Sequence, residues 1–145
     1  MISVLNKYSK KTGEICYKLL IASVLIFSSC EKVEGPGGMA KITGKVIIED
    51  YNSDFTVLRD VYPAQAYDVY LIYGNDSFYG DRIKTSYDGY FEFDFLREGD
   101  YTVFVYSKDK SFDYNSTSEK IPVFRNVKIL SKRQVLEVND LIVVK

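Results

Sequence analysis

The sequence contains no histidine and no tryptophan, and its only cysteines are Cys16 and Cys30. Without histidine the chain lacks the commonest general base, the usual metal ligand and the middle residue of a Ser-His-Asp triad. With so few cysteines it cannot build a zinc site from a cysteine cluster. These absences exclude most hydrolytic mechanisms, and we expect no catalytic residues, no metal and no cofactor.

The chain also lacks a hydrophobic run long enough to cross a membrane. The longest apolar run, Leu19 to Phe27, has nine residues, whereas a membrane-spanning helix needs about 20. Four lysines and a single acid precede this run, and Ser28, Ser29 and Cys30 follow it. That order is typical of an export signal.

The small residues before Cys30 resemble the lipobox of bacterial lipoproteins. The resemblance implies that a peptidase cuts before Cys30 and that the Cys30 thiol carries a diacylglycerol, with palmitate-like chains. An ordinary secretory signal and a buried helix are the alternatives for the apolar run. The expected location is the bacterial cell envelope, anchored by lipid to the outer membrane and facing either the periplasm or the cell surface.

The order of segments predicts how the chain is divided. We assign residues 1–29 to a lipoprotein signal peptide and residues 40–145 to one domain. Between them, residues 30–39 carry three glycines around Pro36, a composition that favours a flexible, lipid-linked tether.

No large excess of one charge is present. Residues 30–145 hold 15 Lys and Arg against 19 Asp and Glu. Nucleic-acid binding needs clustered cations that release counterions from phosphates. A mildly acidic chain without a basic stripe therefore argues against a nucleic-acid partner.

Apolar residues recur at every second position from Lys41 onward, which is the pattern of half-buried strands. The pattern predicts seven strands and no amphipathic helix, over residues 41–50, 67–73, 82–86, 90–95, 101–106, 120–129 and 135–144. The expected fold class is all-β, an antiparallel seven-stranded β-sandwich.

Several residues refine this prediction. Phe91, Phe93 and Phe95 share one side of their strand, and Pro122 favours an edge position for its strand. The parity of residues 135–144 shifts near Asn139 and Asp140, which indicates a bulge or a break. Residues 107–118 are polar and are expected to form a long surface loop.

The turns carry the most specific pattern. Asp88-Gly89 separates two alternating runs, as in a type I′ hairpin, and Gly99 begins the next reversal. With the flanking strands this stretch resembles the carboxypeptidase regulatory-like domains, through the matching residues Thr85, Gly89, Phe91, Phe93, Leu96, Gly99, Tyr101 and Val103. The resemblance implies a transthyretin-like (prealbumin-like) Greek key. It also implies a non-catalytic module that stabilises an enzyme, links modules, or presents loops to a carbohydrate or protein partner.

Two acidic groups are candidate sites. Glu92 and Asp94 share a strand face and are formally able to act as a carboxylate pair, but such alternation is typical of a solvated outer face. Asn75, Asp76 and Asp81 offer oxygen atoms to calcium, and the same residues are ordinary turn residues.

Aromatic residues are abundant, with 13 Tyr and 9 Phe. Most have core parity, but Tyr70, Ile72, Phe104 and Tyr106 have the outward parity of their strands, and we take these four as the candidate partner-binding residues. The loop 107–118 or the C-terminal tail covers them, or else a partner does, in a homodimer or a heterologous complex.

Two function classes stay open. The first is an anchored, non-catalytic interaction or scaffold module that binds another envelope protein. The second is a carbohydrate-binding module in which exposed tyrosines stack on sugars.

Overall fold

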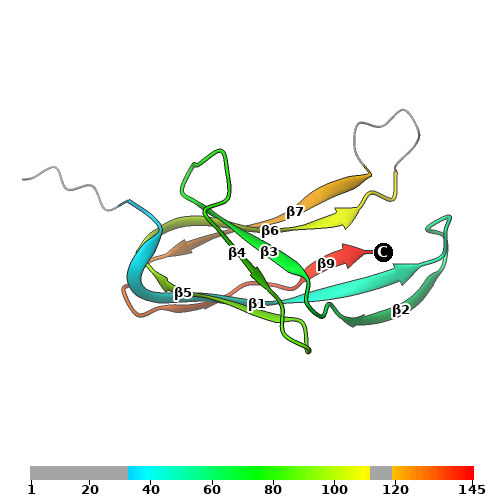
Figure 1. The fold of residues 1–145 in the computed structure, drawn as a ribbon, viewed down its shortest axis with the longest axis horizontal. Helices are drawn as coiled ribbons and strands as arrows, with labels where there is room; N and C mark the ends of the chain where they lie inside the picture. The colour runs from blue at the N-terminus through cyan, green and yellow to red at the C-terminus, as the bar shows by residue number, and fades with distance from the viewer. Residues whose placement is uncertain (1–32, 112–118) are drawn as a thin grey trace, which may run out of the picture. The chain divides into compact units, whose positions relative to one another are not determined.

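The computed structural model describes residues 33–111 and 119–145, and within them it shows strands and no α-helix (Figure 1). The apolar run, Cys30 and residues 112–118 lie outside this part of the chain. Within the described ranges, no helix is long and apolar enough to cross a membrane. The strands are β1 Pro36–Tyr51, β2 Leu58–Pro63, β3 Asp68–Tyr73, β4 Asp81–Lys84, β5 Tyr90–Leu96, β6 Gly99–Lys108, β7 Lys120–Ile129, β8 Val135–Glu137 and β9 Leu141–Val144.

The strands form two packed sheets, which confirms the all-β sandwich. One sheet has the order β4-β3-β6-β7 and is antiparallel throughout. In the other, β1 pairs with β2 and β5 antiparallel and with β8 and β9 parallel. In the view of Figure 1, β6 and β7 lie above β1 and β9. Because Pro122 belongs to β7, which pairs only with β6 among the described strands, the predicted edge position is confirmed.

The strand count is nine where seven were predicted. One addition is β2, whose side chains are almost all exposed, so its sequence shows no alternation. The other comes from the last predicted strand, which is interrupted at Val138–Asp140 into β8 and β9, at the expected break. These two pieces run parallel to β1, so the sheet is mixed and not purely antiparallel as predicted.

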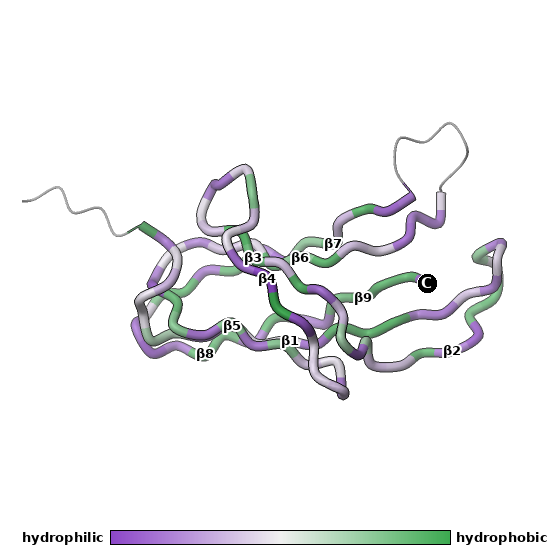
Figure 2. Tube along the Cα trace, viewed as in Figure 1, coloured by the Kyte–Doolittle hydropathy of each residue, from purple (hydrophilic) through white to green (hydrophobic). Residues whose placement is uncertain are grey.

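The core lies between the sheets and follows the predicted parity of β1. Ile42, Val46 and Ile48 point inward, and Gly44 leaves space for the ring of Phe91, which lies 2.6 Å from where a Cβ would be. Strand β9 is hydrophobic along its length (Figure 2) and contacts β6 and β7 of the other sheet. The remaining fully buried large side chains are Phe93, Leu71, Leu96, Tyr101, Ile129, Leu141, Val69, Val103 and Val105.

Phe95 departs from the prediction. It was expected inside with Phe91 and Phe93, but 71% of it is exposed. Its φ is +58°, in the left-handed region, and the register between β1 and β5 shifts beside it. The extra residue reverses the parity of the strand, so Leu96 enters the core in its place.

The segment expected to be a tether is partly built into the sandwich. β1 begins at Pro36, four residues before the predicted domain boundary, and a side chain on Gly38 would overlap the carbonyl oxygen of Leu96. The Gly35 N–H donates to the Tyr101 hydroxyl (3.0 Å), which in turn donates to the carbonyl of Arg97 (2.8 Å). These bonds hold residues 35–39 against the β5–β6 turn.

The Asp88-Gly89 turn differs from the predicted hairpin. Among the described residues other than glycine, only Phe55, Ala66 and Phe95 have a positive φ, so Asp88 does not supply the second left-handed residue of a type I′ turn. Gly89 has φ +79° and its N–H donates to the carbonyl of Ser86 (3.0 Å). The turn connects β4 in one sheet to β5 in the other.

Candidate functional site

The outer face of the β4-β3-β6-β7 sheet carries the predicted outward residues. The register aligns Tyr70 of β3 with Phe104 of β6, and Phe104 with Phe124 of β7. On the other side of β3, the register aligns Tyr70 with Arg82 of β4. One row of aromatic side chains therefore crosses three neighbouring strands on the face turned away from the core.

The rings in this row contact one another and two further tyrosines. Tyr70 stacks on Phe104 with ring centroids 4.9 Å apart, and Tyr106 meets both rings edge-on at 5.6 and 5.5 Å. Tyr79 meets Tyr70 edge-on at 4.9 Å, and Phe124 lies 5.5 Å from Phe104. We call these five residues, Tyr70, Tyr79, Phe104, Tyr106 and Phe124, the aromatic cluster.

The aromatic cluster is covered in its centre and open at its rim. Phe104 is only 6% exposed, whereas Tyr106 is 42% exposed and Tyr79 and Phe124 are about as open. Of the four predicted residues, the structure brings three into the cluster. Ile72 lies one step along β3, beside Thr102 of β6. The rim therefore exposes three aromatic rings to solvent. The rings of Tyr106 and Phe124 pack on the buried Phe104, and the ring of Tyr79 packs on Tyr70.

A hollow of about 230 Å³ adjoins the cluster at Tyr70 and Tyr106. Its lining is Ala66, Tyr67, Asp68, Tyr70, Tyr106 and Lys120, and we call it the tyrosine hollow. The Tyr67 hydroxyl donates to the backbone carbonyl of Tyr106. Burial, followed by the nearby Tyr70 and Asp68, raises the pKa of Tyr67, so this phenol stays protonated to a higher pH than a free tyrosine does.

Asp68 gives the tyrosine hollow a positioned carboxylate. Its Oδ1 lies 3.1 Å from Lys84 Nζ and 3.9 Å from Arg82 Nε, both on β4. The carboxylate side chain is about one third exposed. It therefore lies beside two cations and is still open to a ligand.

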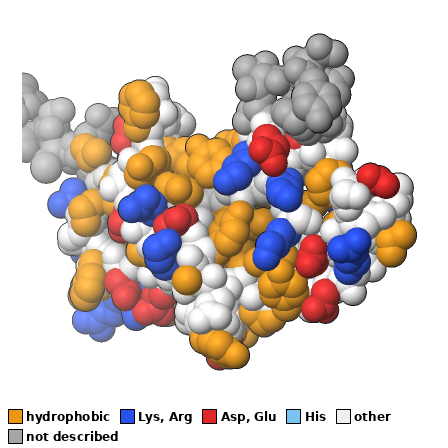
Figure 3. All heavy atoms as spheres, turned by 45° about the vertical axis from the view of Figure 1, so that its right-hand side comes forward, with side chains coloured by type: hydrophobic (Ala, Val, Ile, Leu, Met, Phe, Trp, Pro, Cys, Tyr) orange, Lys and Arg blue, Asp and Glu red, His pale blue; other side chains and the backbone are white. Residues whose placement is uncertain are grey.

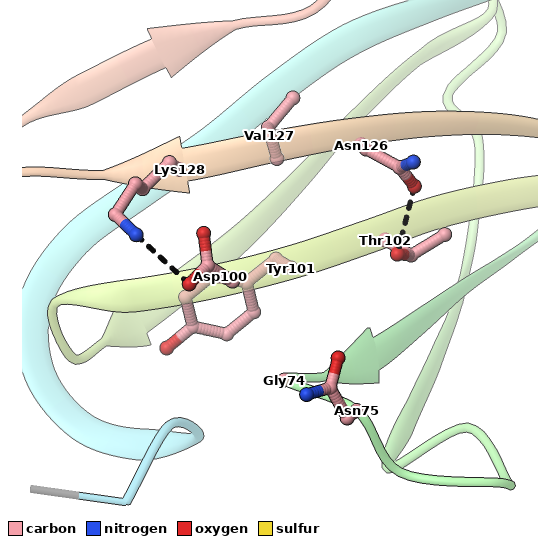
Figure 4. A pocket seen from close by; sticks show the side chains of 8 residues that line it. All are labelled: Gly74, Asn75, Asp100, Tyr101, Thr102, Asn126, Val127 and Lys128. Atoms are coloured by element: carbon pink, nitrogen blue, oxygen red, sulfur yellow. Dashed lines mark hydrogen bonds and ion pairs between the residues drawn. The ribbon is translucent and has the colours of Figure 1, made fainter.

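A second hollow, of about 370 Å³, lies farther along the same sheet (Figure 4). Its lining is Gly74, Asn75, Asp100, Tyr101, Thr102, Asn126, Val127 and Lys128, and we call it the amide hollow. Thr102 Oγ1 donates to Asn126 Oδ1 (2.9 Å), and Lys128 Nζ lies 2.9 Å from Asp100 Oδ2. Figure 4 shows the Asn75 amide on the opposite side of the hollow from these two pairs.

One loop, residues 74–80, serves both regions. Gly74 has φ +52°, which glycine adopts readily, and its N–H donates to the Asp100 carbonyl (2.8 Å). The Gly80 N–H returns to the Leu71 carbonyl (2.9 Å), and a side chain on Gly80 would overlap the ring of Tyr73. These contacts place Asn75 in the amide hollow and Tyr79 in the aromatic cluster.

The acidic pair Glu92 and Asp94 lies on the other sheet. Lys41 Nζ is 2.7 Å from Asp94 and 2.8 Å from Glu92, and hydrogen bonds to Asp94 and then to Glu92 raise the pKa of Lys41. The two carboxylates are therefore charge partners of an exposed lysine on an outer face, with no hollow beside them among those described.

The residues considered for calcium have other contacts in the structure. Asp81 Oδ1 accepts the backbone N–H of Arg82 (2.7 Å). In the described part of the chain, no three acidic, cysteine or histidine side chains gather as a metal site would require. Asn75 instead lines the amide hollow.

The sequence pattern missed part of the site. Phe124 and Asn126 have the same parity as Pro122 on β7, and this parity would have identified their face once β7 was paired with β6. Tyr79 carries no such signal, because it lies in a loop.

Space-filling Figure 3 shows hydrophobic side chains beside both Lys or Arg and Asp or Glu, without a large patch of one sign.

Comparisons with known proteins found no family model and no curated protein that matches this chain. Among solved structures, a crystal structure from Pseudomonas aeruginosa described as a "putative carbohydrate binding protein" is similar at 12% sequence identity and a TM-score of 0.47. The match covers 82% of this chain and 94% of that one. A likeness of this size carries no information on the ligand of the chain described here.

Proposed function

We propose that this protein is a non-catalytic carbohydrate-binding module, held on the bacterial envelope by a lipid on Cys30. The observation that carries the proposal is the aromatic cluster, which has three half-open rings. One of these rings, Tyr106, lines a hollow together with a carboxylate, an ammonium group and a second phenol. Sugars present apolar C–H faces and polar hydroxyl edges, and a binding site for them needs both kinds of surface side by side.

Each part of the site has a role in this proposal. The rings of Tyr106 and Tyr79 stack on the C–H faces of sugar units. The Asp68 carboxylate accepts hydrogen bonds from hydroxyl groups, while the Lys120 ammonium group donates to them. The Tyr67 hydroxyl already donates to a backbone carbonyl, so its oxygen is left to accept from the ligand.

The positions of the acidic residues fit a module that binds its ligand without catalysing a reaction. The chain has no histidine, and the one acidic pair that the sequence suggested is bound to Lys41 on the opposite sheet. Asp68, in the proposed site, is paired with two cations within 4 Å. A glycosidase needs a second, protonated carboxyl group nearby, and the tyrosine hollow is lined by a single acid.

A protein partner is the second candidate, and the edge strand β7 favours it. In the described structure β7 pairs only with β6, and Ile121 and Phe124 on it are exposed. An envelope protein, or a second copy of this chain, could add a strand there and cover the aromatic cluster. In that case the module would be a scaffold.

A glycan array on the purified protein tests the proposal. We expect binding to one family of glycans, and we expect Tyr106→Ala to weaken it about tenfold, since one stacked ring contributes about 1–3 kcal/mol. The matched control is Tyr87→Ala, which removes a tyrosine that is 77% exposed in the β4–β5 turn. Equal binding by both variants would show that the glycan binds at a different site. If the wild-type protein binds no glycan, the result would favour the protein partner.

A further inference from the structure

We infer that the site takes a linear, neutral oligosaccharide that runs along β6 from the tyrosine hollow, over the aromatic cluster, into the amide hollow. The inference rests on the proposed carbohydrate-binding function and names the shape and charge of the ligand. It depends on three features of the sheet: the shared face of the two hollows, the distance between them and the charges that line them.

The two hollows lie on one face because their side chains have the same parity on β6. Asp100, Thr102, Phe104 and Tyr106 follow at every second position, between Lys128 and Asn126 on one side and β3 on the other. Thr102 and Asp100 line the amide hollow, and Tyr106 lines the tyrosine hollow. Phe104 lies between them, at the centre of the aromatic cluster.

The distance between the two hollows requires an oligosaccharide of several units. Tyr106 and Thr102 are four residues apart on one strand, which corresponds to about 14 Å at the rise of an antiparallel strand. A single sugar ring cannot contact both hollows over that length, whereas a chain of several units can. At the tyrosine hollow, Tyr70 contacts the ring of Tyr79 and stacks on Phe104, which lies toward the amide hollow. The path therefore starts on aromatic surface on which sugar units stack.

The amide hollow is suited to hydrogen bonding with hydroxyl groups. Asn126 and Thr102 form a fixed pair, Thr102 donating to Asn126, so the Asn126 amide N–H groups are directed to other acceptors. The Asn75 amide faces this pair from the loop (Figure 4). Amide groups both donate and accept, which matches the mixed requirements of sugar hydroxyls.

The lining charges favour a neutral ligand. Each hollow is lined by one acid and one cation, Asp68 with Lys120 and Asp100 with Lys128. Asp100 and Lys128 are already paired at 2.9 Å. Beside the tyrosine hollow, Lys84 and Arg82 also lie within 4 Å of Asp68. A uronic-acid or sulfated chain would bring one negative charge per unit and would compete with Asp68 and Asp100 for the cations that these carboxylates already hold.

The test is a size series on the full mature protein, measured by isothermal titration calorimetry. The probes are neutral gluco-, xylo- and manno-oligosaccharides of increasing length, together with oligogalacturonate fragments as the charged series. We expect the affinity for one neutral series to rise with length until the chain reaches both hollows, and we expect the charged series to bind more weakly.

Two variants locate the second end of the chain. Asn126→Ala and Asn75→Ala should each weaken binding of the longest fragments about fivefold, the value of one or two hydrogen bonds, and leave binding of the shortest binding fragment unchanged. Asn139→Ala, which truncates an exposed asparagine between β8 and β9, is the matched control and should bind as the wild type does.

The outcomes separate the two proposals. Affinity that does not depend on length, or an equal loss for short and long fragments in Asn126→Ala, overturns the extended chain and leaves the carbohydrate-binding function standing. Tighter binding of the oligogalacturonate series overturns the neutral ligand. Failure of every fragment to bind at any length overturns both the inference and the proposed function.

Discussion

Tyr70 and Phe104 stack nearly parallel on the outer face of the sheet, with ring centroids 4.9 Å apart and an angle of 16° between the ring planes. They belong to β3 and β6, whose register aligns them directly. Tyr106 and Tyr79 meet Tyr70 edge-on. Because every ring has an aromatic neighbour, the face is ordered before any ligand arrives, which lowers the entropic cost of binding.

Phe104→Ala tests the support that this ring gives to its neighbours. We expect the free energy of unfolding to fall by about 3 kcal/mol, because a nearly buried phenyl ring is removed from the centre of the aromatic cluster. Tyr106→Ala, at the open rim, should lower it by less than half as much. Thermal and urea unfolding measure both values, and an equal cost for the two variants would contradict the arrangement of a covered centre and an open rim.

Tyr101 holds the start of β1 to the β5–β6 turn, and its pKa makes this contact depend on pH. Burial raises the pKa of Tyr101 above its usual 10.0. A raised pKa in the folded state means that the stabilisation is complete below pH 10 and is lost as the pH rises through the higher folded value.

Tyr101→Phe should therefore lower the free energy of unfolding by about 1 kcal/mol at neutral pH, through the lost hydrogen bonds to Gly35 and Arg97. It should also make stability fall less steeply than in the wild type as the pH rises above 10. Urea unfolding at several alkaline pH values gives both results. An unchanged slope would show that Tyr101 does not contribute to the alkaline loss.

Gly89→Val tests the β4–β5 turn. The φ of Gly89 is +79°, and a Cβ would lie 2.6 Å from the Val46 carbonyl oxygen. We expect a loss of about 2 kcal/mol or more and a melting temperature lower by several degrees, from backbone strain and the displaced carbonyl. Ligand affinity of the folded protein should not change. Tyr87→Val in the same turn is the control, and similar melting of the two variants would contradict the close approach.

Cys30→Ala tests the lipid anchor. Two acyl chains hold a protein on a bilayer through about 0.8 kcal/mol per buried methylene. We expect the variant to move from the membrane fraction to the soluble fraction, and mass spectrometry should find a lipid-modified cysteine at the N-terminus of the wild type only. A variant that still pellets with membranes, with no lipid on the wild type, would rule out the anchor.

The sequence predicted the parts of the fold that depend on local alternation. The inward residues of β1, β3 and β6 follow period two and are buried as expected. The failures involve long-range contacts. β2 is exposed on nearly every side chain and forms only because β1 extends beyond β5 to pair with it. Gly38, inside the segment assigned to the tether, lies against the backbone of Leu96.

The candidate site was predictable to a similar extent. Parity alone identified Tyr70, Phe104 and Tyr106 as outward-facing. It could not show that Phe104 would be covered by its neighbours, because that requires the pairing of β6 with both β3 and β7. The contribution of Tyr79 depends on a loop whose path is set by Gly74 and Gly80, and single-strand patterns contain no information on such a path.

The most direct test of the carbohydrate-binding face is an NMR titration of the isotope-labelled protein with the glycan that the array identifies. We expect the largest changes in chemical shift to fall on the aromatic cluster and on the residues of the two hollows, in the β4-β3-β6-β7 sheet. Changes confined to the outer face of the β1 sheet, around Lys41 and Glu92, would contradict it.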